Sequence, residues 1–141
     1  MKSLGAVMAF TNQRNQALLL AYRRIIRDVP FVSLAEIGEL LVNSPSPRFW
    51  VSEERAAAVV SALLRNKPVL ETMRPTKQEM FREIFKRVTD LRQQQPDWTL
   101  LQLVSVVINQ PAPKFYMKAS SAIERLYKIR NGWYQNARNG K

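Results

Sequence analysis

Hydrophobic residues recur through the first half of the chain at the three- and four-residue spacing of one helical face. This spacing predicts a helix that opens near Thr11 or Asn12 and ends near Asp28, a second over 34–42 and a third that follows Ser52. The apolar faces of these three helices comprise Ala17, Leu18, Ala21, Tyr22, Ile25, Ile26, Leu34, Ile37, Leu40, Leu41, Ala56, Val59, Val60 and Leu63.

The second half repeats this series, with helices predicted to open near Thr76, Thr99 and Ala119. Their apolar faces comprise Met80, Phe81, Ile84, Phe85, Val88, Leu91, Leu100, Leu103, Val104, Val107, Ala122, Ile123 and Leu126. A chain whose periodicity is helical almost throughout buries helix against helix. We therefore expect an all-α fold of about six helices.

Hydroxyl residues mark several helix starts. Three candidate capping boxes place Glu or Gln three residues after a hydroxyl, at Ser33–Glu36, Thr76–Glu79 and Thr99–Gln102. Ser52 is a further candidate cap, and Asn131-Gly132 is typical of a helix end. Two prolines exclude a continuous helix over 45–51, which we expect to be extended.

One stretch occurs twice. Residues 43–51 read Asn-Ser-Pro-Ser-Pro-Arg-Phe-Trp-Val, and residues 109–117 read Asn-Gln-Pro-Ala-Pro-Lys-Phe-Tyr-Met, an ungapped offset of 66 residues. We interpret the chain as a tandem duplication of a three-helix unit whose halves pack together, because each copy is near the smallest size that supports a core. The predicted organisation is a loose leader (1–10), a first repeat (11–66), a linker (67–75), a second repeat (76–130) and a basic aromatic tail (131–141).

The repeated motif has two interpretations. In the structural one, the prolines stiffen the connection between helices while the Phe fills the core and its basic and aromatic neighbours cover the edge. In the functional one, Arg48 and Lys114 contact phosphates while Trp50 and Tyr116 stack on bases or on side chains of a partner. The sequence leaves both open.

The order of the helices resembles a three-helix helix-turn-helix module, in which the last helix enters the major groove. The likeness is one of topology, and the connection over 43–52 is longer than the usual tight turn. The first copy of the last helix opens with Ser52-Glu53-Glu54, which is acidic, whereas the second copy is basic. On this resemblance the second copy is the better candidate for a nucleic-acid reader.

Charge favours a polyanionic partner. The 141 residues include 22 Lys and Arg against 11 Asp and Glu, a net charge of +11, and the excess is larger in residues 71–141 than in residues 1–70. Basic side chains off an apolar helical face also occur as an ordinary solvated surface. We expect DNA or RNA as the partner and keep an acidic protein or self-association as the alternative.

The residue types present argue against an enzyme. The chain contains no Cys and no His, which excludes thiolate and imidazole chemistry, and the carboxylates are explained as caps or surface charges. We therefore predict no catalytic residue, no metal site and no cofactor. The apolar run in residues 1–10 is too short for an export signal or a membrane span, so we expect a cytoplasmic protein.

These observations predict a non-enzymatic nucleic-acid-binding protein; the alternative is a structural or adaptor protein that uses the repeated motif for assembly. The candidate binding residues are Arg48, Trp50, Arg82, Lys86, Arg87, Lys114, Tyr116, Lys118, Arg125, Lys128 and Arg130.

Overall fold

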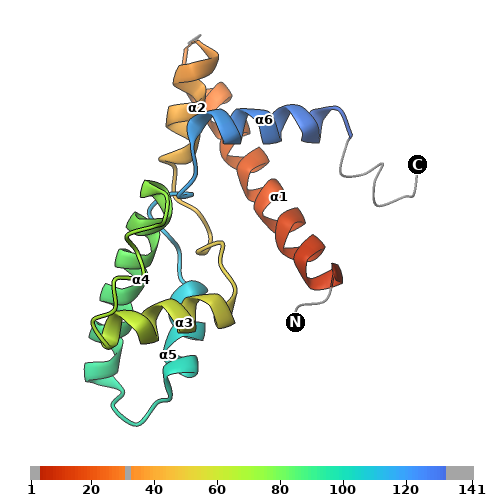
Figure 1. Ribbon diagram of the computed structural model, residues 1–141. Coiled ribbons are helices and arrows are strands. Elements are labelled where there is room, and N and C mark those ends of the chain that lie inside the picture. The colour runs from red at the N-terminus through yellow and green to blue at the C-terminus, as the bar shows by residue number, and fades with distance from the viewer. Residues whose placement is uncertain (1–3, 31–32, 133–141) are drawn as a thin grey trace. The chain divides into compact units, whose positions relative to one another are not determined.

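A computed structural model describes residues 4–30 and 33–132, with side chains from Phe10 onward in those ranges (Figure 1). Within them it contains six helices and no strand, which confirms the all-α prediction. The helices are α1 (Leu4–Asp28), α2 (Leu34–Val42), α3 (Glu53–Leu64), α4 (Pro75–Gln94), α5 (Leu100–Ile108) and α6 (Ala119–Arg130). The predicted tail residues Trp133, Tyr134, Arg138 and Lys141 lie outside the described residues.

The helices group into two compact units. Unit 1 comprises Met1–Ser44 with Met117–Lys141 and contains α1, α2 and α6, which pack against one another. Unit 2 comprises Pro45–Tyr116 and contains α3, α4 and α5, also in mutual contact. Each unit therefore takes its third helix from the other predicted repeat. The repeat bounds stay a prediction about the sequence, while the compact units divide the chain differently.

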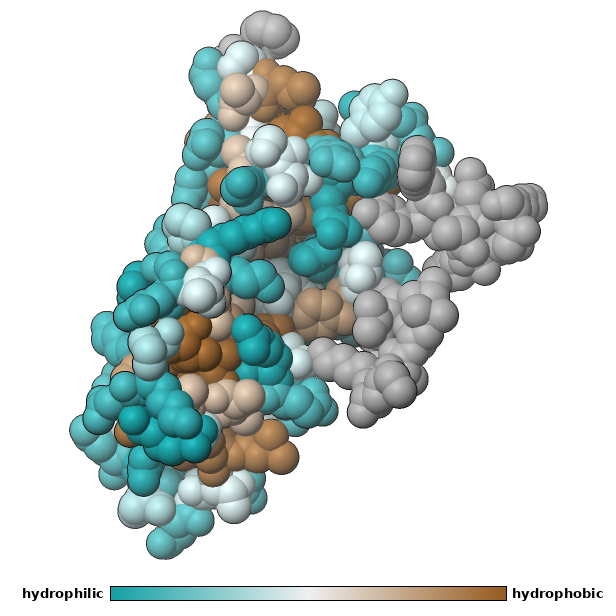
Figure 2. All heavy atoms as spheres, viewed as in Figure 1, coloured by the Kyte–Doolittle hydropathy of each residue, from teal (hydrophilic) through white to brown (hydrophobic). Residues whose placement is uncertain are grey.

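Unit 2 has an extensive hydrophobic core that joins its three helices to the repeated motif. Its fully or nearly fully buried members are Phe49, Val51, Ala56, Val59, Val60, Met80, Phe81, Ile84, Val88, Leu103, Val104, Val107, Ile108 and Ala112. The predicted linker contributes as well, because Val69, Leu70 and Met73 pack against this core. In the space-filling view, apolar side chains show between hydrophilic ones over α3, α4 and α5 (Figure 2).

Unit 1 buries a smaller set of side chains, including Leu18 and Ala21 of α1, Leu41 of α2 and Leu126 of α6. Close packing of α2 on α6 depends on Gly38. A Cβ added there would lie 3.1 Å from the backbone oxygen of Ala119 and 3.1 Å from Cγ1 of Ile123. Glycine is therefore the residue that lets these two helices approach.

Side-chain caps confirm several predicted helix starts. The Ser33 and Ser52 hydroxyls accept hydrogen bonds from the N–H groups of Glu36 and Arg55. The Thr99–Gln102 box is complete: the Gln102 N–H donates to the Thr99 hydroxyl, and the Thr99 N–H donates to the Gln102 side chain. These bonds satisfy amide groups that a helix N-terminus leaves without an intrahelical acceptor.

Two predicted helix starts are wrong. α1 already begins at Leu4, so Thr11 and Asn12 lie inside it and cap nothing. α4 begins at Pro75 with Arg74 at its cap, and no side chain caps it. Proline suits the first helical position because its fixed φ is already helical, so the helix opens one residue before Thr76. Glu79, the expected second half of that box, pairs with Lys114 instead.

Candidate functional site

Both copies of the repeated motif lie in unit 2, where they run alongside each other. Ser46 and Ala112, which are equivalent positions of the two copies, form an isolated antiparallel bridge. The Ser46 N–H donates to the Ala112 carbonyl at 2.9 Å, and the Ala112 N–H donates to the Ser46 carbonyl at 2.8 Å. The Phe49 N–H donates to the Ile108 carbonyl at the end of α5. Backbone bonds thus hold the first copy against the second.

Arg48 and Trp50 fold back onto their own segment. The Arg48 guanidinium donates to the carbonyls of Phe49 and Val51 at 3.0 and 3.2 Å and lies 5.5 Å from the centre of the Trp50 ring. The Trp50 indole N–H donates to the buried Ser46 hydroxyl at 2.8 Å. Partial burial lowers the pKa of Arg48, while the Glu53 carboxylate acts in the opposite direction.

Lys114 and Tyr116 make the corresponding contacts in the second copy. Lys114 forms an ion pair with Glu79 on α4, and its ammonium lies 5.9 Å from the centre of the Tyr116 ring. The Tyr116 ring stacks on Phe49 with a centroid distance of 5.9 Å and an interplanar angle of 16°. Burial, reinforced by the carboxylates of Glu83 and Glu79 and opposed by Arg87, raises the pKa of Tyr116 to about 12.

The predicted basic residues of α4 divide into one packed and two surface side chains. The half-buried Arg87 donates to Glu83 at 2.7 Å and to the Pro111 carbonyl at 2.9 Å. Its guanidinium also lies 5.0 Å from the centre of the Phe49 ring. Arg82 and Lys86 are exposed. Arg87 therefore joins α4 to both copies of the motif, a packing role that its charge alone did not indicate.

The remaining predicted residues belong to unit 1. Lys118 and Arg130 are exposed at the two ends of α6, whereas Arg125 and Lys128 are half-buried and Lys128 pairs with Glu124 at 3.1 Å. The candidate residues are thus distributed over both units: those from Arg48 to Tyr116 lie in unit 2, and those from Lys118 to Arg130 lie in unit 1.

Unit 1 carries most of the positive charge. It has 11 Lys and Arg against 4 Asp and Glu, a net +7, whereas unit 2 has 11 against 7, a net +4. Arg23, Arg24 and Arg27 are exposed on α1, in the same unit as α6. These arginines are absent from the predicted site, although the scarcity of nearby acidic residues was a signal available in the sequence. Their grouping with α6 was not.

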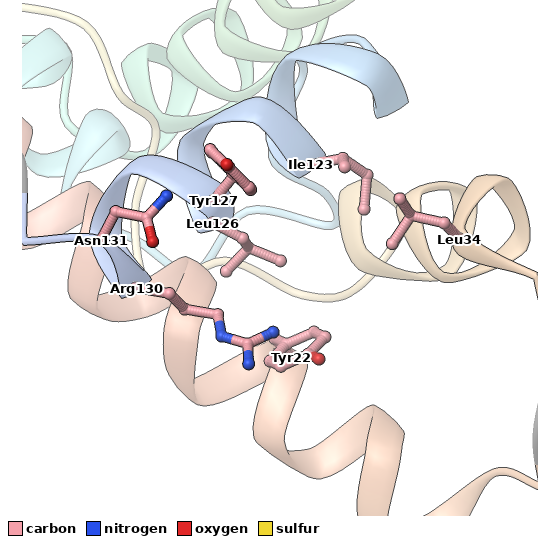
Figure 3. A pocket seen from close by; sticks show the side chains of 7 residues that line it. All are labelled: Tyr22, Leu34, Ile123, Leu126, Tyr127, Arg130 and Asn131. Atoms are coloured by element: carbon pink, nitrogen blue, oxygen red, sulfur yellow. The ribbon is translucent and has the colours of Figure 1, made fainter.

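A hollow in unit 1 combines aromatic, apolar and cationic side chains (Figure 3). Its volume is about 400 Å³. It is lined by Tyr22, Leu34, Ile123, Leu126, Tyr127, Arg130 and Asn131. Tyr22 and Tyr127 were not predicted as site residues, because the helices that carry them are far apart in the sequence.

Unit 2 has a shallower groove beside α5, lined by Glu53, Trp98, Leu101, Gln102, Ser105 and Val106. Three of its apolar side chains are exposed, Trp98 by 38%, Leu101 by 51% and Val106 by 40%. The Glu53 carboxylate is held at one side, where it accepts a hydrogen bond from the Ser105 hydroxyl at 2.9 Å.

No protein-family model, curated protein or solved structure matches the chain. In the described part of the chain, no three acidic side chains come together as a metal site would require. No described helix is both long enough and apolar enough to cross a membrane.

Proposed function

We propose that this chain is a cytoplasmic, non-enzymatic nucleic-acid-binding protein that contacts the phosphate backbone mainly through basic side chains of unit 1. The observation that carries the proposal is the concentration of charge, with +7 of the net +11 in that unit. Four acidic residues cannot neutralise eleven basic ones. Lys and Arg that replace condensed counterions on phosphates supply affinity for DNA or RNA of any sequence.

The exposed basic side chains of α1 and α6 are the proposed contacts. Arg23, Arg24 and Arg27 extend from α1, and Lys118 and Arg130 from α6. The motif residues Arg48 and Lys114 have a different role in this proposal. Their bonds to backbone carbonyls and to Glu79 support the packing interpretation, in which they stabilise unit 2.

We also propose that the chain arose by duplication and that the two copies exchanged their third helices. The offset of 66 residues relates the bounds of α2 to those of α5 and the bounds of α3 to those of α6. It also relates Ser46 to Ala112, the two residues that form the bridge. The unit that resembles a helix-turn-helix module is then α1, α2 and α6, with the basic α6 as its third helix.

The charge proposal is tested by fluorescence anisotropy with labelled DNA and RNA at several salt concentrations. We expect binding that weakens steeply with salt, with a slope of log K against log salt of about −0.9 per phosphate neutralised on duplex DNA. Changing Arg23 and Arg24 together to Gln should reduce the magnitude of that slope by about two. The matched control changes Lys67 and Lys77, two exposed basic residues of unit 2, to Gln.

The control variant has the same net charge as the Arg23 and Arg24 variant, so a general charge effect would weaken both equally. Loss of affinity confined to the unit 1 variant supports the proposal. Absence of binding at low salt for every DNA and RNA probe refutes it.

One observation favours the alternative of a protein that acts by assembly. Trp98, Leu101 and Val106 form an exposed apolar groove on unit 2, and apolar surface of this kind is typical of protein contacts. Sedimentation equilibrium distinguishes the alternative, because apolar self-association persists at high salt whereas phosphate binding does not.

A further inference from the structure

We infer that the hollow of unit 1 binds one base of a single-stranded nucleic acid and that Arg130 contacts the adjoining phosphate. The inference rests on the proposed function and narrows its ligand from any nucleic acid to a strand with unpaired bases.

The shape of the hollow suits a flat ring flanked by charge (Figure 3). Leu34 of α2 and Ile123 of α6 point toward each other and form an apolar end. At the other end the Arg130 side chain extends from α6 toward the ring of Tyr22 on α1. A volume of about 400 Å³ lies within the range of sites that enclose small organic ligands.

Two aromatic side chains provide stacking surfaces. Tyr127 is 68% exposed on α6, an unusually high exposure for a large aromatic ring, and Tyr22 lines the hollow from α1. Stacking on aromatic rings is how proteins bind unpaired bases without strong sequence preference. The bases of a duplex are already stacked and paired, so their faces cannot reach such rings.

Charge distinguishes a nucleotide from an apolar peptide as the occupant. Arg130 lines the hollow itself, and Arg23 and Arg24 directly follow Tyr22 on α1. A neutral apolar ligand gains nothing from these cations, whereas a strand with a charge at each nucleotide does. The arrangement is the basic and aromatic pairing that the sequence suggested for the repeated motif, here at an accessible surface.

The apolar end is held in place before any ligand binds. α2 and α6 approach so closely at Gly38 that an added Cβ would meet Ala119 and Ile123 at 3.1 Å. Ile123 and Leu34 are carried by these two tightly packed helices, so a base would enter an existing space.

The test compares a labelled single strand with a hairpin duplex at the same salt concentration. The single strand carries 2-aminopurine, a base whose fluorescence is quenched by stacking. We expect the single strand to bind at least about ten-fold more tightly and its fluorescence to fall on binding. Tyr127→Ala should weaken single-strand binding by about ten-fold and remove the quenching, as expected for loss of one stacking ring. It should leave duplex binding unchanged.

Three further variants control this test. Tyr127→Phe keeps the ring and should retain both affinity and quenching, whereas Arg130→Gln should weaken binding and keep the quenching. Trp98→Ala removes an exposed aromatic from unit 2 and should change neither. Circular dichroism of each variant establishes that it is folded.

The outcomes separate the two proposals. Equal affinity for single strand and duplex, or equal losses for both on Tyr127→Ala in a folded variant, overturns the single-strand inference and leaves the phosphate-binding proposal standing. Absence of binding to either probe at low salt overturns both.

Discussion

Replacing Phe49 with Ala should unfold much of the stability of unit 2. The Phe49 side chain is 0% exposed, its ring stacks on Tyr116 and the Arg87 guanidinium lies 5.0 Å from its centre. Truncation of a fully buried Phe removes its transfer free energy and leaves a cavity, at a cost of about 3–5 kcal/mol. Domains of this size have total stabilities of about 5–15 kcal/mol at most, so the loss is a large fraction.

Urea denaturation followed by tryptophan fluorescence measures this loss. The chain has three tryptophans, and replacing Trp133 with Phe leaves Trp50 and Trp98, which both lie in unit 2. With a urea dependence of about 1–3 kcal/mol per molar, a 3 kcal/mol loss lowers the midpoint by at least about 1 M. Phe85→Ala is the matched control: Phe85 is only half-buried at the edge of the same core and should cost less. Equal shifts for both variants would refute the assignment of Phe49 to the centre of the core.

Three other predictions follow from single contacts. Thr99→Ala should destabilise unit 2 by about 1 kcal/mol in the same urea assay, because it removes a cap, whereas Thr76→Ala, which removes none, should change stability by less than about 0.5 kcal/mol; equal losses would contradict the two cap assignments. Gly38→Val should destabilise unit 1 by about 1–3 kcal/mol, and Gly38→Ala by less, in thermal unfolding followed by circular dichroism, since the added methyls meet the Ala119 backbone; an unchanged Gly38→Val midpoint would contradict the close approach of α2 and α6. The pKa of Tyr116 is raised to about 12, so between about pH 10 and 12 the unfolded chain loses this proton first and stability falls as pH rises; the fall should be smaller in Tyr116→Phe when urea midpoints are compared at pH 9 and 11, and an equal fall would refute it.

Features set by neighbours in the chain could be predicted from the sequence. Ser52 and Thr99 are caps because a hydroxyl before an apolar periodic run finds the amides of the next turn, whatever lies elsewhere in the molecule. The same local reasoning failed at Thr76, where Pro75 opens the helix first, and at Thr11, which lies inside α1.

Grouping of the helices could not be predicted in this way. An offset that superposes α3 on α6 makes the two helices equivalent, and equivalence does not say which pair of earlier helices each one packs against. The position of Tyr127 beside the same hollow as Tyr22 depends on that choice. Charge and aromatic neighbours drew attention to Arg48, yet the same properties let it bind its own carbonyls and ring.

The grouping makes a last prediction about fragments. Unit 2 is one continuous segment, Pro45–Tyr116, and contains the whole of the large hydrophobic core, whereas unit 1 is built from two separated segments. A fragment of residues 45–116 should therefore fold alone, with helical circular dichroism and a cooperative thermal transition. Its 72 residues are near the lower limit for an independent core, so the transition should be weak but present.

A fragment of residues 11–66 is the matched comparison, because it is a complete predicted repeat of similar length. It carries α3 without α4 and α5, the two helices on which α3 packs, so its apolar face has no partner within the fragment. Helices whose apolar faces lack a partner are marginal in water. We expect this fragment to be largely unfolded or to associate. A cooperative transition in residues 11–66, together with none in residues 45–116, would show that the repeat rather than the compact unit is what folds, and the proposed exchange of third helices would then be wrong.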